Sequence, residues 1–478
     1  MNATTLNTPP APDFASHLGA VVRVSLPLAL SQLSEMAMGV TDTMLLGGVG
    51  VAALAVGGIS NNFFMSTMIT FQSCLGGAGV LLSHSKGAAD HGREALHDGR
   101  AVMSAGLAVA VLITVPCWWI LSQSGLLFAW LHEPADVVTQ GSHFIDILLR
   151  ALLPDICVIG LWRVALPALG AERLLLWIMP MMAVCNGILN DALIHGRWGL
   201  PRMGLFGSAT ATTLTGWTIS LALMALCAAR PPLRAVMLPT LPRWHSVKAV
   251  LKLGLPMMAS AAAEILMFQI TTLEAGQLGT DSLASHQVAL NTASLLFMVC
   301  LAISQAANIR VAYWLGAGTK HEAGQSALAA LALVVGWTCC TGGLLLAFPH
   351  VVAHWFYSAG TASAGTMAAT VVLLRIAGLF QIVDGIQAVC TGILRGCGDV
   401  LRPMLTGIAT YGVFGLGFGH WLAFRQGWGV TGLWVGLASG LGLTALVLGW
   451  CVWHRFFSPA ARHGARLGAA PAPTPAGR

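Results

Sequence analysis

Long apolar stretches dominate this chain of 478 residues and restrict it to folds that can sit in a lipid bilayer. A helix needs roughly 20 mostly apolar residues to cross the hydrocarbon core of a membrane. Backbone N–H and C=O groups in the hydrocarbon core must be hydrogen-bonded within the protein, which only α-helices and closed β-barrels achieve. No stretch of this chain shows the alternation of apolar and polar residues that is typical of a barrel strand. We therefore predict an all-α integral membrane protein with twelve transmembrane helices. These helices are expected at 24–46, 58–83, 101–121, 142–166, 174–195, 204–228, 250–276, 287–312, 326–347, 367–394, 404–424 and 430–453.

The composition argues against an enzyme. Apolar residues make up 56% of the chain and charged residues only 9%, so the polar segments are too short for a separate catalytic domain. The sequence contains no HExxH or GxSxG motif, and its eleven cysteines include no CxxC pair. We predict that the protein is not an enzyme and uses no cofactor.

One hydrophobic segment occurs twice, which indicates an internal duplication. LPLALSQLSEMAMGVTDTMLLGGVG at 26–50 is similar to LPMMASAAAEILMFQITTLEAGQLG at 255–279, an offset of 229 residues. A glutamate occupies the same repeat position in both, Glu35 and Glu264. An ionisable group inside an apolar span is costly enough to suggest a function, and its recurrence makes chance much less plausible.

The duplication predicts two six-helix lobes, an N-lobe at 21–229 and a C-lobe at 250–457. A basic, proline-rich linker at 230–249 joins them. Because each lobe has an even number of spans, both enter the membrane from the same side. They should be related by a pseudo-two-fold axis along the membrane normal, as a parallel repeat. The polar segments 1–20 and 458–478 are expected to be disordered.

The distribution of basic residues predicts the orientation in the membrane. Lysine and arginine gather at both termini and in the loops after even-numbered spans, whereas the opposite loops hold only Arg197, Arg202 and Arg425. Cytoplasmic loops carry the excess of basic residues, so both termini should be cytoplasmic. The net charge of +6 follows from this asymmetry, and no nucleic-acid partner is expected.

Carboxylates within the apolar spans are the candidate functional groups. Glu35 and Asp42 are seven residues apart and lie on one face of a helix, about two turns from each other. The C-lobe keeps Glu264 and gains Asp384, so the two lobes are chemically unequal. Asp155 is either a functional group or a carboxylate satisfied by its neighbours. Such groups can exchange a proton or small cation for a cationic substrate.

Four segments give the chain a family resemblance. They are GVTDTMLLGG at 39–48, NGILNDALIHGRWGLPRMGLFGSATAT at 186–212, SHQVALN at 285–291 and LRGCGDVLRPM at 394–404. With these segments the chain resembles the multidrug and toxic compound extrusion (MATE) family, in particular its bacterial NorM-like branch. The resemblance implies a multi-pass protein of the bacterial inner membrane, with twelve helices in two lobes and a central cavity. It also implies efflux of cationic or amphipathic drugs by alternating access, in exchange for protons or sodium.

The resemblance assigns roles to individual residues. Asp42 matches the first-helix aspartate of the N-lobe cation site. Glu264 and Asp384 match the C-lobe acids, which would be the metal ligands if sodium is the coupling ion. Phe380 stands where an aromatic hydroxyl is common, which removes one oxygen from a sodium shell. Glu35 lies outside the family pattern and is a candidate for the drug cavity. Asn186, Asn190 and Thr212 match polar residues that accompany Asp42 in proton-coupled members of the family. Gln287 and Asn291 are further binding candidates.

Two other functions compete with drug efflux. A lipid-linked oligosaccharide flippase of the same superfamily would need basic residues in the cavity to hold a pyrophosphate. A channel would not need titratable groups in both halves. With drug efflux as the leading function, the expected partners are small cationic or amphipathic drugs, a proton or sodium ion and the bilayer. The expected oligomeric state is a monomer.

Overall fold

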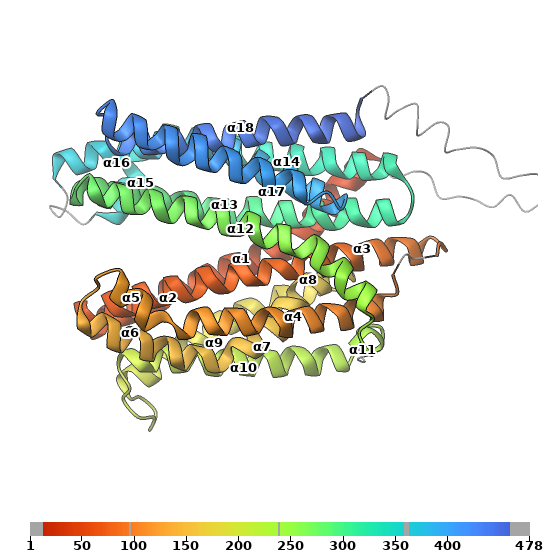
Figure 1. Cartoon of the computed structure of the whole chain (residues 1–478), viewed down its shortest axis with the longest axis horizontal. Coiled ribbons are helices and arrows are strands. Elements are labelled where there is room, and N and C mark those ends of the chain that lie inside the picture. Colours follow the sequence, from red (N-terminus) through yellow and green to blue (C-terminus); the bar gives the residue numbers. More distant parts are fainter. Residues whose placement is uncertain (1–12, 95–96, 238–239, 358–362, 459–478) are drawn as a thin grey trace, which may run out of the picture.

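The computed structural model describes residues 13–94, 97–237, 240–357 and 363–458, which form helices joined by short turns (Figure 1). The first half contains α1 (Phe14–Val49), α2 (Val51–Gln72), η1 (Ser73–Leu75), α3 (Gly76–Asp90), α4 (Gly99–Ser122), α5 (Ser124–Trp130), α6 (Ala135–Leu148), η2 (Leu149–Ala151), α7 (Leu152–Pro154), η3 (Asp155–Gly160), α8 (Leu161–Ala168), α9 (Arg173–His195), α10 (Leu205–Ala228) and α11 (Pro231–Met237). The second half contains α12 (Trp244–Gln277), α13 (Thr280–Gly316), α14 (Lys320–Ala347), α15 (Pro349–Phe356), α16 (Ala364–Gly396), α17 (Leu401–Thr410), η4 (Tyr411–Phe418), η5 (Trp421–Arg425) and α18 (Val430–Phe456).

The helices are those of a multi-pass membrane protein. Within the described ranges, ten helices are long and apolar enough to cross a membrane, and they coincide with ten of the twelve predicted spans. The other two stretches are interrupted helices. Residues 142–166 pass through 3-10 and π turns between α6 and α8, and residues 404–424 continue from α17 into the π segments η4 and η5. Membrane-spanning by these two stretches stays a prediction.

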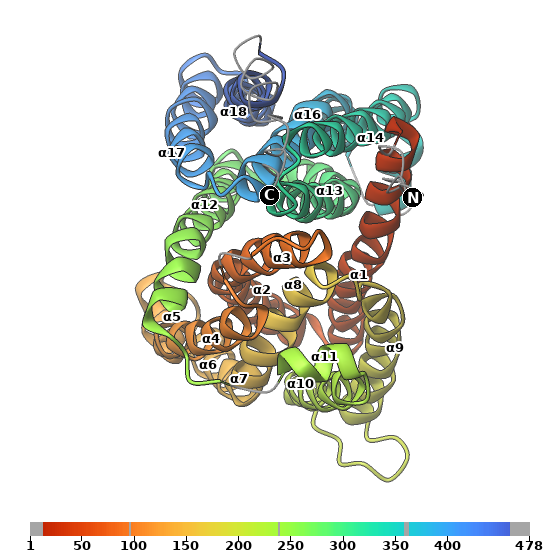
Figure 2. The same ribbon diagram turned by 90° about the vertical axis from the view of Figure 1, so that its right-hand side faces the viewer.

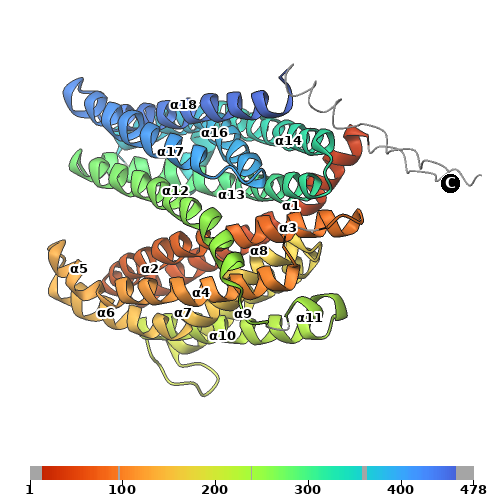
Figure 3. The same cartoon turned by 45° about the vertical axis from the view of Figure 1, so that its right-hand side comes forward.

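The helices form two bundles, which we call the N-lobe (α1 to α10) and the C-lobe (α12 to α18). The bundles meet where α1 begins and α18 ends, which we call the closed end, and their ribbons diverge toward the opposite end (Figures 1 and 3). Several clusters of buried apolar side chains form the interior, and the largest lies mainly in the N-lobe. The lobes are therefore packed mainly within themselves and joined at one end.

Backbones of the two lobes touch where α3 crosses α13. A Cβ atom on Gly87 would lie 1.9 Å from the carbonyl oxygen of Tyr313, and one on Gly316 would lie 2.1 Å from that of His84. No side chain fits at either position, because such contacts are far inside van der Waals separation. By the repeat offset of 229 residues, His84 corresponds to Tyr313 and Gly87 corresponds to Gly316. The crossing is thus self-complementary.

The first helix of each lobe begins against the other lobe (Figure 2). In Figure 2, α1 starts beside α14 and then descends beside α9, while α12 starts near α4 and rises toward α17. Gly254 of α12 packs so closely on the N-lobe that a Cβ there would lie 2.1 Å from the carbonyl oxygen of Cys74. The two lobes are therefore connected through their first helices as well as through the linker.

Two boundaries differ from those predicted. Helix α1 begins at Phe14, inside the segment 1–20 that was expected to be disordered, because His17 and Val21 are buried in the protein. Helix α11 and the first turn of α12 lie within the predicted linker 230–249. Residues 1–12 and 459–478 are outside the described part, so the expected disorder there stays a prediction.

Candidate functional site

The predicted N-lobe site forms around Asp42 of α1. Asp42 is buried, and the Asn190 amide of α9 donates a hydrogen bond to its Oδ1 atom. Asn190 also donates to the hydroxyl oxygen of Ser208 on α10 over 3.3 Å. Asp42 and Thr212 line the same small pocket, together with Ser208. The structure therefore brings together Asp42, Asn190 and Thr212 as expected.

Asn186 lies beside this group without joining it. Its side-chain nitrogen donates to Thr215 over 3.4 Å, on the neighbouring helix α10. The side-chain oxygens of Asn186 and Asn190 are buried without a hydrogen-bond partner among the described residues. These two oxygens lie one turn apart on α9, and only Asn190 is bonded to Asp42, so this part of the N-lobe interior has hydrogen-bonding capacity that the described side chains do not use.

A second N-lobe pocket contains Glu35. Its Oε2 atom lies 2.7 Å from Nη1 of Arg163 on α8, and Nη2 of Arg163 donates to the side-chain oxygen of Gln32. Asp155 lines the same pocket and interacts electrostatically with Glu35. The empty space, counted together with the open solvent at its mouth, is about 590 Å³, and five of the fifteen residues that line it are methionines. These are Met38, Met65, Met68, Met179 and Met182.

Arg163 is a residue that the sequence reasoning missed. It lies in the predicted span 142–166, 128 positions from Glu35, so no helical spacing connects the two residues. An arginine inside an apolar stretch was the available signal, because such a residue needs a counter-charge. The carboxylate of Glu35 is consequently paired with the positively charged side chain of Arg163 inside this pocket.

The C-lobe acids lie on α12 and α16. Asp384 is buried, its Oδ1 atom has no hydrogen-bond partner among the described residues, and it interacts electrostatically with Glu264. Glu264 in turn interacts with Arg395, from the last turn of α16. The predicted acids therefore lie in one electrostatic group, and Arg395 partly balances their charge.

Tyr411 supplies an aromatic hydroxyl that the sequence did not predict. It is buried in η4, interacts electrostatically with Glu264 and Asp384, and accepts a hydrogen bond of 2.6 Å from the Gln387 amide. Phe380, where a hydroxyl was noted as missing, is buried against Trp434 with ring centroids 5.6 Å apart. The hydroxyl near the acids thus comes from a different helical segment.

Three buried oxygens on α16 lack hydrogen-bond partners within the described chain, and they share one face of that helix. They belong to Gln381, Asp384 and Thr391, at positions i, i+3 and i+10. The described residues contain no group of three or more His, Cys, Asp or Glu that could hold a metal ion. Gln381 lies one turn from Asp384, whereas Thr391 lies about 10 Å further along the helix axis, so the three oxygens cannot surround a single ion.

Gln287 and Asn291 lie apart from these contacts. Both are exposed on one face of α13, and no hydrogen bond connects either of them to Glu264 or Asp384 in the described structure. The repeat counterpart of Asn291 is Asn62, on α2. The side chain of Asn62 accepts a hydrogen bond of 2.8 Å from Gln269 of α12, which is a polar contact between the lobes.

Comparison with known proteins gives the family. The MatE family model matches the chain twice, at residues 27–190 and 256–421. The multidrug resistance protein NorM of Burkholderia vietnamiensis is 40% identical over 442 residues, which cover 92% of this chain and 94% of the relative. A probable multidrug resistance protein NorM of Burkholderia mallei is also 40% identical, over 96% of this chain and 97% of the relative.

Solved structures show the same fold. A eukaryotic MATE transporter superposes with a TM-score of 0.80 at 19% identity, covering 96% of this chain and all of the other. A MATE protein in a bent conformation superposes with a TM-score of 0.82 at 18% identity, covering 95% of this chain and all of the other. With acids in both lobes, a family model matched in both halves and relatives aligned over nearly their whole length, the chain belongs to the MatE family of multidrug and toxic compound extrusion transporters.

Proposed function

We propose that the protein is a secondary antiporter that exports cationic or amphipathic compounds in exchange for protons or sodium. The observation that carries this proposal is a buried carboxylate inside each lobe, Asp42 in one and Asp384 in the other, with buried oxygens that lack hydrogen-bond partners in each lobe's described residues. A carboxylate removed from water is stabilised by a proton or a cation, so uptake and release of that ion can drive a change between two states. The similarity to multidrug resistance proteins supports multidrug substrates.

The compounds would occupy the methionine-walled pocket around Glu35 and the space between the lobes. Methionine side chains are flexible and polarizable, so they adapt to ligands of different shape. The carboxylates of Glu35 and Asp155 favour positively charged groups. Arg163 offsets part of that charge, so the apolar wall contributes more of the affinity than it would in a purely acidic pocket.

We infer a twelve-helix arrangement in which the lobes are related by a parallel repeat. Two features support this: the two matches to the family model begin 229 residues apart, at 27 and 256, and the α3–α13 crossing is self-complementary. Rocking of the two lobes about this crossing would alternate access to the pocket. The basic residues support an orientation with both termini cytoplasmic, in the bacterial inner membrane. The closed end would then face the cytoplasm.

A flippase is less well supported by the same residues. A pyrophosphate group would need free cationic side chains, whereas Arg163 in the N-lobe pocket is paired with Glu35 and Gln32. Arg395 in the C-lobe interacts with Glu264. Both arginines are thus already engaged by groups of the protein itself.

Ethidium efflux from proteoliposomes would test the proposal. A sodium gradient alone and a pH gradient alone would each be applied to the parent protein, to Asp42→Asn and to Glu264→Gln. Sodium-driven efflux abolished only by Glu264→Gln would place coupling in the C-lobe, whereas pH-driven efflux abolished by Asp42→Asn would place it in the N-lobe. Absence of efflux from the parent under both gradients would overturn the antiporter.

A further inference from the structure

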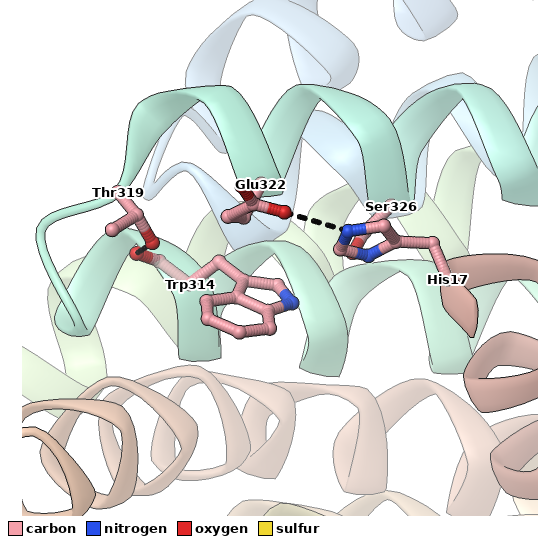
Figure 4. Close-up of polar contacts among 5 residues, drawn as sticks. All are labelled: His17, Trp314, Thr319, Glu322 and Ser326. Carbon is pink, nitrogen blue, oxygen red and sulfur yellow. Dashed lines mark hydrogen bonds and ion pairs between the residues drawn. The ribbon is translucent and has the colours of Figure 1, made fainter. Parts of the chain in front are cut away.

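A histidine at the start of α1 reaches across to α14 and connects the two lobes (Figure 4). Nε2 of His17 lies 2.7 Å from Oε2 of Glu322, and its Nδ1 lies 3.0 Å from the hydroxyl oxygen of Ser326. The His17 side chain is fully buried, and that of Glu322 is only 11% exposed. We call these three residues the clasp. It joins positions that are 305 residues apart in the chain.

Both ring nitrogens of the clasp histidine have partners that suit either protonation state. Glu322 accepts a hydrogen bond from Nε2 whether the ring is neutral or positively charged. Ser326 can donate to Nδ1 when it is bare and can accept when it carries a proton, because a hydroxyl group does both. The contact therefore persists in either state, as a hydrogen bond strengthened by the charge of Glu322.

The carboxylate of Glu322 does not cap the start of its own helix α14, although its position in the sequence predicts that it would. Thr319 and Glu322 have the spacing of a capping box, in which the glutamate returns to the backbone at the start of its own helix. Here Thr319 makes no side-chain capping bond at the start of α14, and its hydroxyl instead donates to the carbonyl oxygen of Trp314 over 3.3 Å. Glu322 faces His17 instead (Figure 4). The contact between lobes thus takes the place of a local helix cap.

Aromatic and charged groups from both lobes surround the clasp. The Trp314 ring of α13 meets His17 edge-on with centroids 5.9 Å apart, and it also meets His91, which directly follows α3, at 5.6 Å. Arg310 lies over Trp314 at 5.5 Å and interacts electrostatically with Glu172. The clasp is therefore next to the place where α3 and α13 cross, and both lobes contribute to its surroundings.

A proline separates the clasp from the acids on the same helix. Pro27 lies inside α1, between His17 on one side and Glu35 and Asp42 on the other. A proline within a helix removes one backbone hydrogen bond and weakens the helix at that point. Helix α1 consequently has a first segment held by the C-lobe and a second segment that carries the N-lobe acids.

We propose that the clasp is a positioning device of the transport cycle, which keeps the start of α1 on the C-lobe and the two lobes together at the closed end. Opening of that end works against the clasp, because Glu322 and Ser326 move with the C-lobe while the part of α1 after Pro27 stays packed in the N-lobe. The clasp thereby sets the ratio of closed to open molecules. This inference rests on the proposed function, since it assumes that the lobes alternate between two arrangements.

Distances between spin labels on the two lobes test the clasp. Exposed positions on helices near the closed end are Arg100 in α4 and His454 in α18, so the labels would be attached to Arg100→Cys and His454→Cys. Native cysteines that a label could reach would be replaced by serine. These are Cys185, Cys339, Cys340, Cys397 and Cys451.

We expect His17→Ala and Glu322→Gln each to increase the ratio of long to short label distances by roughly tenfold, which corresponds to about 1.4 kcal/mol. The double exchange His17→Glu with Glu322→His should restore part of the short-distance population, which a general loss of folding would not allow. A control is His420→Ala, because His420 and Glu274 form a histidine–glutamate contact of 2.8 Å within the C-lobe alone, although His420 is 55% exposed. That variant should keep the parent distribution.

An unchanged distribution in both His17→Ala and Glu322→Gln would overturn the clasp. An equal shift in His420→Ala would also overturn it, because the effect would then not depend on a contact between the lobes. The label distances do not depend on which compound is carried. Failure of ethidium efflux together with a shifted distribution would therefore reject the proposed substrate or coupling and leave the clasp standing.

Discussion

Arg163 of α8 and Glu35 of α1 form an ion pair of 2.7 Å inside the N-lobe pocket, across 128 positions of the chain. Both side chains are largely removed from solvent, at 16% and 26% exposure. Two charges in such a place stabilise each other, and each is costly without the other. The pair therefore affects both the stability of the lobe and the charge that a bound compound meets.

Glu35→Gln should lower the apparent melting temperature, because it leaves Arg163 without its counter-charge. We expect a loss of about 1–3 kcal/mol, which is less than for a fully buried pair. Arg163→Gln should have a similar effect, and the double variant should be more stable than either single one. Thermal unfolding in detergent measures this, and simple addition of the two losses would contradict the pairing.

Gly87→Ala should separate α3 from α13, because its Cβ would lie 1.9 Å from the Tyr313 carbonyl oxygen. Overpacking of this kind costs about 1–3 kcal/mol, so we expect a lower melting temperature. We also expect a larger fraction of molecules in which the two lobes have separated at the end where they normally meet. Gly336→Ala on α14 is the control, since nothing lies within 4 Å of the added atom. Equal melting temperatures for the two variants would argue against a tight crossing.

Tyr411→Phe should destabilise the C-lobe and impair ion coupling at the same time. The buried amide of Gln387 would lose its 2.6 Å partner, at a cost of about 1–3 kcal/mol. The acids would lose a nearby hydroxyl, so efflux should require a steeper ion gradient. Melting curves and efflux at graded ion gradients would be compared. An unchanged gradient dependence would show that the hydroxyl acts on stability alone.

Acidification should weaken the fold through His97, in the turn between α3 and α4. Burial, and secondarily the nearby charge of His245, lower the pKa of His97 below its ordinary value. A base whose pKa is lowered in the folded state binds protons more readily when unfolded, so stability falls as the pH drops through the ordinary histidine range near 6.5.

The difference in melting temperature between pH 7.5 and pH 5.5 tests this effect. We expect that difference to become smaller in His97→Gln than in the parent. Exposed His350→Gln is the comparison that should leave the difference unchanged. A parent protein that is more stable at pH 5.5 would refute this account.

The sequence was sufficient for the elements that depend on local composition. Ten of the predicted spans coincide with long apolar helices, since hydropathy alone decides whether such a segment can cross a membrane. The interrupted stretch from α17 to η5 was not foreseen, because it depends on packing. A Cβ on Gly436 would lie 2.3 Å from the Cα atom of Gly419, so the backbones of α18 and this stretch are in direct contact.

The acidic residues of the candidate site could be predicted from the sequence, whereas the residues that contact them could not. Asp42, Glu264 and Asp384 are conspicuous because each is a lone charge in an apolar segment. Arg163 and Tyr411 come from helices remote in sequence, so only the packing of the lobe brings them to Glu35 and to the C-lobe acids. Family resemblance grouped Asn190 with Asp42, and in the structure their side chains are hydrogen-bonded.

The contact between the start of α1 and the C-lobe has a consequence for biosynthesis. A ribosome adds about 5–20 residues per second, so Glu322 is made roughly 15–60 s after His17. Throughout that interval the start of α1 has no α14 to lie against, although most of α1 can already pack in its own lobe. The first helix to enter the membrane is thus among the last to reach its final surroundings. In a nascent chain released before α14 is made, the start of α1 would lack the residues that it contacts in the complete protein. That unpaired helix start would distinguish an incomplete chain from a complete one.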